Sequence, residues 1–87
     1  MAEARGVRQT IHDKIVLIAK ELGNDARAIG WDEEIPSSGF LDSAGIMELI
    51  LWLEVEFGIE IDQASLTLEN FGSINAIASY LAKAKAA

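Results

Sequence analysis

The chain has 87 residues, of which 51% are hydrophobic and 24% charged, and this length allows one modest core but no deep enclosed cavity as well. Its 14 acidic and 7 basic side chains give a formal net charge of −7, which disfavours nucleic acid and anionic lipid and favours partners with basic surfaces. No cysteine is present, which excludes disulfides and thiolate metal sites. We therefore expect a single folded domain over residues 1–87, in which any chemistry is shallow or is supplied by a partner.

No segment of the sequence has the pattern of a secretory signal or a membrane anchor. The longest apolar run near the N-terminus, Ile15 to Ala19, is much shorter than the apolar region of a signal peptide. No stretch approaches the ~20 apolar residues that a membrane-spanning helix needs. We expect a cytoplasmic protein with no membrane partner.

The first predicted element is an amphipathic helix from about Ala2 to Leu22. Its apolar residues recur at steps of three and four and form one stripe that faces the core: Val7, Ile11, Ile15, Ile18 and Leu22. Gly23 and Asn24 are typical of helix ends and terminate it.

Residues 23 to 42 form a long connection, because they lack a sustained period and include glycine, proline and serine. Long loops inside a compact domain are uncommon, and they are usually functional or held in place. The candidates for holding this loop are its large apolar residues: Ile29, Trp31, Ile35, Phe40 and Leu41.

A second long helix is predicted from Ser43 to about Phe57. Asp42 is placed to cap the free N–H groups at its start, and Gly58 is placed to end it. Residues 62 to 70 are expected to hold one short helix.

The last helix begins after Gly72, where Ser73 is a good N-cap. Its inward-facing residues are expected to be Ile74, Ile77, Ala78 and Leu81. These elements together predict an all-α fold, a four-helix bundle of three main helices and one short helix, with a long loop between the first two.

The sequence offers no recognisable catalytic or metal site. The only histidine, His12, has no second histidine or cysteine with which to bind a metal or activate a nucleophile. Three consecutive acidic residues at 32–34 lack the spacing of a calcium loop, which needs glycine at its sixth place, where this chain has Ser37. We therefore expect a protein that is not an enzyme and binds no metal.

The second long helix has two apolar stripes, whereas an ordinary surface helix has one. The core stripe consists of Ile46, Leu49, Ile50, Leu53 and Phe57, and the opposite stripe of Met47, Leu51 and Val55, flanked by Glu48 and Glu54. Apolar residues rimmed by carboxylates form a plausible docking surface for a partner with a basic groove. The alternative is that the long loop or the short helix covers this second stripe, which would then belong to the core.

Ser43 follows Asp42 at the start of this helix, where backbone N–H groups and the helix dipole favour a phosphate. Serine and aspartate are also common at helix starts simply as capping residues. The residues alone therefore leave both interpretations open.

Three blocks of the sequence, in order, resemble the acyl carrier protein family. Residues 39–49, GFLDSAGIMEL, resemble the attachment site of that family, in which an Asp-Ser pair opens the second helix. Residues 53–61, LEVEFGIEI, are similar to the end of that helix and its exit. Residues 66–71, LTLENF, together with Ser73-Ile74, Ala76-Ile77 and Tyr80-Leu81, resemble the third helix and the start of the fourth.

The resemblance implies a carrier whose cofactor is 4′-phosphopantetheine, attached to Ser43 by a separate transferase that uses coenzyme A and magnesium. The thiol of this arm would carry acyl groups as thioesters, and Asp42 would help to bind the transferase complex. The recognition face would consist of Met47, Glu48, Leu51 and Glu54. The implied partners are a phosphopantetheinyl transferase and a ligase, synthase or acyltransferase with a basic docking surface, acting on a monomeric, non-catalytic carrier.

Two positions depart from the members that serve fatty acid synthesis. Those members usually have glycine three places before the serine and leucine directly after it, where this chain has Phe40 and Ala44. The form GFLDS resembles D-alanyl carrier proteins and specialised carriers, which favours a dedicated pathway. Gly45 in the first turn also lowers helix propensity, by up to about 1 kcal/mol relative to alanine. The alternatives are an aminoacyl carrier of the D-alanyl type and an unmodified helical adaptor.

Overall fold

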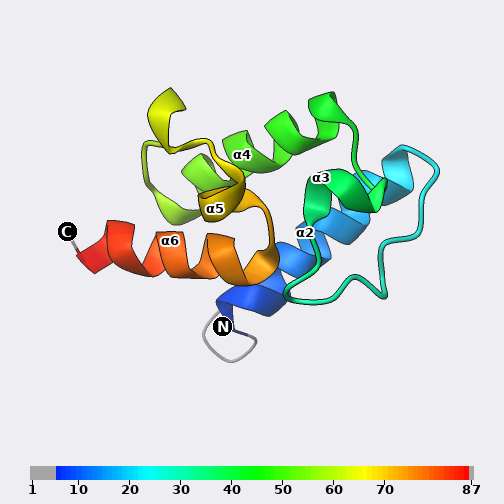
Figure 1. Ribbon diagram of the computed structural model, residues 1–87, viewed down its shortest axis with the longest axis horizontal. Coiled ribbons are helices and arrows are strands. Elements are labelled where there is room, and N and C mark those ends of the chain that lie inside the picture. Colours follow the sequence, from blue (N-terminus) through cyan, green and yellow to red (C-terminus); the bar gives the residue numbers. More distant parts are fainter. Residues whose placement is uncertain (1–5, 87) are drawn as a thin grey trace.

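The computed structural model describes residues 6–86, and over that range every regular element is helical (Figure 1). The elements, in chain order, are α2 (Val7–Glu21), α3 (Ile35–Ser38), α4 (Ser43–Phe57), the 3₁₀-helix η1 (Gln63–Ser65), α5 (Leu68–Phe71) and α6 (Ile74–Ala86). Three of the helices are long, as predicted, and α2 contacts both α4 and α6, while α5 packs against α6. The all-α class is confirmed. None of the helices in the described range is long and apolar enough to span a membrane.

Helix α2 begins at Val7 in the described range, and the predicted start near Ala2 lies outside the described residues. Its end is closed as predicted, with Gly23 in the left-handed conformation at φ 83°. The Gly23 N–H donates to the Lys20 carbonyl at 3.0 Å, and the Asn24 N–H donates to the Ala19 carbonyl at 2.8 Å. This pair of hydrogen bonds is a Schellman motif, which fixes the direction in which the chain leaves α2.

The predicted core stripe of α2 is correct in the middle and wrong at its ends. Ile11, Ile15 and Ile18 are buried, whereas Val7 and Leu22 remain 41% and 42% exposed. Val7 is the first residue of α2 and Leu22 is its C-cap, so both lie at the margins of the buried stripe.

The long connection contains the four-residue helix α3, which the sequence analysis did not predict. One turn is too short to show a period, but two local signals are present: Pro36 at its start and Gly39, with φ 82°, at its end. The Ile35 N–H also donates to the Gly72 carbonyl at 2.7 Å, which ties α3 to the chain just before α6.

The loop is held by buried apolar residues, as predicted, but Trp31 is not one of them. Ile29, Ile35 and Leu41 are buried, and Phe40 is half-buried against the core. The Trp31 side chain is 40% exposed and meets the His12 ring edge-on, so it does not anchor the loop in the core. Its backbone does hold the loop, because the Trp31 carbonyl accepts from the Asn75 N–H at 2.9 Å.

Helix α4 has the predicted bounds, Ser43 to Phe57, because both of its ends carry strong local signals. Asp42 caps its start, and Gly58 at φ 64° allows the Ile59 N–H to turn back to the Glu54 carbonyl at 3.1 Å.

The single short helix predicted for residues 62 to 70 is wrong in form. Two separate turns occur instead, η1 and α5, because each has its own cap. The Asp62 carboxylate accepts from the Ser65 N–H at 3.0 Å, and the Thr67 hydroxyl accepts from the Asn70 N–H at 3.2 Å. The predicted cap of α6 is confirmed, since the Ser73 hydroxyl accepts from the Ala76 N–H at 3.1 Å.

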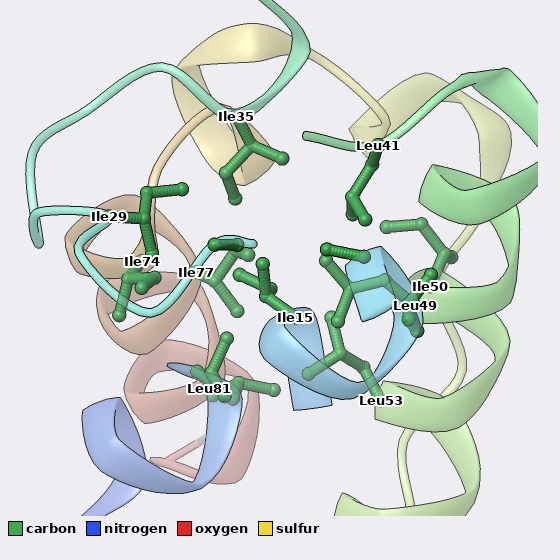
Figure 2. Packing of buried hydrophobic residues seen from close by; sticks show 14 residues of the cluster. Ile15, Ile29, Ile35, Leu41, Leu49, Ile50, Leu53, Ile74, Ile77 and Leu81 are labelled. Atoms are coloured by element: carbon green, nitrogen blue, oxygen red, sulfur yellow. The ribbon is translucent and has the colours of Figure 1, made fainter. Parts of the chain in front are cut away.

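The core is formed by aliphatic side chains from all the long helices and the connection between α2 and α4 (Figure 2). Leu49 and Leu53 of α4 lie beside Ile15 of α2, and Ile50 lies nearer Leu41, while Ile74, Ile77 and Leu81 enter from α6 (Figure 2). Ala78, predicted to face inward, is half-buried, and Ala26 of the loop is buried without having been predicted. Among the described residues no polar or charged side chain is buried.

Candidate functional site

The Asp42-Ser43 pair forms the start of α4. Asp42 has an extended backbone, and its Oδ1 atom accepts from the Gly45 N–H at 2.7 Å, while its carbonyl accepts from the Ile46 N–H at 2.9 Å. Ser43 is therefore the first residue of a 15-residue helix, and it is exposed. A phosphate on its hydroxyl would lie at the positive end of the helix dipole. The geometry fits a phosphodiester at this serine.

Gly45 lies where α2 comes closest to the first turn of α4. It is buried, and a Cβ built at this position would lie 3.2 Å from Ile18 Cγ2, 3.3 Å from Leu22 Cδ1 and 3.3 Å from Asp42 Oδ1. These contacts are tighter than ordinary van der Waals separation, so any larger residue would press on α2 and on the capping carboxylate at once. Close packing of the two helices therefore offsets the low helix propensity of this glycine.

An apolar groove of about 220 Å³ lies between α4 and the α5 region. It is lined by Pro36, Ile46, Met47, Ile50, Leu66, Thr67, Leu68 and Phe71. Ile46 and Met47 stand one helical turn after Ser43, so the groove opens beside the candidate attachment site. Sequence analysis missed this groove, because it depends on where the two short turns after residue 62 pack.

The second apolar stripe of α4 is exposed. Met47 is 48% exposed, Leu51 56% and Val55 84%. Neither the long loop nor the short helices cover these side chains, so the alternative in which the stripe belongs to the core is wrong. Its role as a docking surface stays a prediction.

The two predicted rim carboxylates of this face differ in their surroundings. Glu48 is exposed, whereas Glu54 is half-buried and its Oε2 atom accepts from the Ile61 N–H at 2.8 Å. Glu54 therefore holds the chain that leaves α4, and only Glu48 of the two is free of that structural task. The sequence pattern could not show this contact, because it spans the turn at Gly58.

The His12 side chain makes a structural contact. Its Nε2 atom lies 3.0 Å from the Arg27 carbonyl oxygen, and its side chain links α2 to the long loop. In the described part of the chain, no three histidine, aspartate or glutamate side chains are grouped closely enough to hold a metal ion.

Comparison with known proteins agrees with this geometry. The family described as "Phosphopantetheine attachment site" matches residues 15–81, which include α4 with Asp42 and Ser43. The fold and site thus define a domain that carries phosphopantetheine. The chain is also 36% identical over 74 residues to the acyl carrier protein of Onion yellows phytoplasma (strain OY-M), covering 84% of this chain and 95% of that protein. The chain belongs to the acyl carrier protein family, and its cofactor is a covalently attached 4′-phosphopantetheine.

The two stripes of α4 can be distinguished by a matched pair of substitutions. Leu53→Ala removes a fully buried side chain and should lower the free energy of unfolding by about 2–5 kcal/mol. Leu51→Ala truncates an exposed side chain and should change it by no more than about 0.5 kcal/mol. Urea denaturation followed by circular dichroism measures both values. Equal losses in the two variants would place Leu51 in the core and contradict the exposed stripe.

Proposed function

We propose that Ser43 bears the phosphopantetheine arm, and that this carrier presents acyl thioesters to partner enzymes in the cytoplasm. The observation that supports it is the exposed position of Ser43 as the first residue of α4, next to its capping aspartate. The apolar groove one turn further along adds a place for an apolar cargo near the arm. Phe40 and Ala44 beside the site favour service in a dedicated pathway.

In this proposal the chain positions Ser43 but provides no catalytic group. The Asp42 carboxylate accepts from the Gly45 N–H, so it serves as a helix cap. The His12 ring is engaged with the Arg27 carbonyl. The transferase therefore provides the base that removes the Ser43 proton, and the isolated carrier turns over no substrate.

The attachment residue is tested by one substitution. Incubation with coenzyme A, magnesium and a phosphopantetheinyl transferase should add one arm to the wild type, and intact mass should show none on Ser43→Ala. Ser79→Ala, which removes an exposed hydroxyl from α6, is the matched control and should be modified normally. A wild type left unmodified by several transferases would favour the adaptor alternative, and a modified Ser43→Ala would refute the site.

We infer that the cargo is an acyl chain rather than an aminoacyl group. The groove is lined by apolar side chains with one threonine and no charged residue. A hydrocarbon chain gains free energy by entering such a lining, at about 0.8 kcal/mol for each fully buried methylene. The ammonium of an aminoacyl group would lose its hydration there without gaining a partner.

This inference about the cargo predicts a difference in thermal stability. Octanoyl-loaded protein should unfold several degrees above the unloaded holo-protein, since 1 kcal/mol corresponds to roughly 4–8 °C in a domain of this size. Alanyl-loaded protein should unfold at the temperature of the unloaded form. Leu68→Ser, at the groove, should reduce the octanoyl effect, and Leu17→Ser, at another exposed leucine on α2, should not. Equal unfolding temperatures for both cargoes would contradict an acyl-binding groove.

We further propose that the outward face of α4, formed by Met47, Glu48, Leu51 and Glu54, docks the transferase and the loading or consuming enzymes. Exposure of the two apolar residues and of Glu48 supports this assignment. Exposed charges mainly accelerate encounter with basic surfaces, whereas a desolvated apolar anchor mainly slows dissociation.

Salt dependence separates these two contributions. Glu48→Lys should slow arm transfer most at low ionic strength, and added salt should narrow the gap from wild type. Leu51→Ala should weaken binding of the transferase at every salt concentration. Glu60→Lys makes the same charge change at an exposed site off this face and should have a smaller effect. Equal effects of the two lysine variants would show that net charge matters and the α4 face does not.

A further inference from the structure

We propose that Asn24 is a positioning residue for Ser43, because its side-chain amide holds the turn that leads into α4. The inference rests on the proposed function of Ser43 as the attachment residue. The Asn24 Nδ2 atom donates to the Phe40 carbonyl at 2.9 Å, across 16 residues of sequence. Phe40 lies three residues before Ser43, so the contact acts on the chain at the entrance to the site.

The backbone of Asn24 is itself fixed. The Schellman motif at the end of α2 places it, through its N–H bond to the Ala19 carbonyl at 2.8 Å. The side-chain amide therefore projects from a defined point, and it can hold Phe40 at a constant place relative to α2.

The residues between Phe40 and Ser43 are also held by contacts with the fold. The position of Phe40 therefore influences the position of Ser43. The Phe40 N–H donates to the Ser38 hydroxyl at 3.2 Å, and the Leu41 side chain is buried. The Asp42 carboxylate accepts a hydrogen bond from the Gly45 N–H. A segment packed in this way moves as one unit, so a displacement at Phe40 also shifts Ser43.

The end of α2 also meets Gly45, two residues after Ser43. Ile18 and Leu22 approach Gly45 so closely that a Cβ there would lie 3.2 and 3.3 Å from them. One end of α2 thus contacts the chain on both sides of Ser43, through Asn24 before it and through Ile18 and Leu22 after it. Asn24 is the polar member of this set, and its side chain is exposed.

Loss of the Asn24 amide should affect the rate of arm transfer within the bound complex. Misplacing a reacting atom by about 1 Å can cost as much as 10²-fold in rate. A general loss of stability acts differently, because it lowers the concentration of folded carrier and raises the apparent KM while kcat at saturation stays unchanged. The two causes can therefore be separated by steady-state kinetics.

The test uses the full chain with a phosphopantetheinyl transferase and coenzyme A. Asn24→Ala should lower kcat for arm transfer about tenfold with KM changed less than about twofold, as expected for a mispositioned nucleophile. Asn24→Asp keeps the size but not the donor, so its kcat should fall in the same way. Ile77→Val, a mild core substitution in α6, is the control for stability and should leave kcat unchanged.

Each outcome has a distinct meaning. A wild type that accepts no arm on Ser43 would refute the proposed function itself. A wild type that is modified at Ser43, with Asn24→Ala retaining wild-type kcat or changing only KM as Ile77→Val does, would overturn the positioning role alone. Circular dichroism of each variant, together with its unfolding temperature, supplies the folded fraction needed for this comparison.

Discussion

The hydrogen bond from the Gly45 N–H to the Asp42 carboxylate determines where α4 begins. Because successive residues of a helix turn by about 100°, the start and the buried side of α4 together assign every side chain to a face. Leu49, Ile50 and Leu53 point into the core, and Met47 and Leu51 point outward. The same bond places Ser43 at the first helical position, so one contact relates the proposed attachment residue, the core face and the exposed stripe.

Elements whose signals are local could be predicted from the sequence. The bounds of α4 follow from Asp42 and Gly58, and the start of α6 follows from Ser73, because each capping residue lies next to the groups it binds. The four-residue α3 and the break between η1 and α5 were missed. The caps Asp62 and Thr67 were readable signals for that break, since both are residue types that favour N-caps.

The residues of the candidate site could be located from the sequence, but their surroundings could not. The helix start at Asp42 and Ser43 suggested a phosphate site, but the residues alone also fitted simple caps, and only the family resemblance favoured attachment at Ser43. The exposure of the second stripe depended on how the loop and the short turns pack, which periodicity does not determine. The prediction for Trp31 was wrong in the opposite direction. This large apolar loop residue was expected to be buried, and its ring instead lies beside His12 at the surface.

The apolar groove and the exposed second stripe of α4 are neighbours, and they share one residue. Met47 lines the groove and also belongs to the exposed stripe. The groove, at about 220 Å³, is smaller than the roughly 300–1,000 Å³ of pockets that enclose drug-sized ligands. It can therefore hold part of an acyl chain without sealing it in. In the proposed function, a partner that packs against Met47 would touch the wall of this groove, so docking and release of the cargo would meet at a single side chain. A carrier must give up its cargo to each partner, and an open groove beside the proposed docking face would meet that requirement without a moving lid.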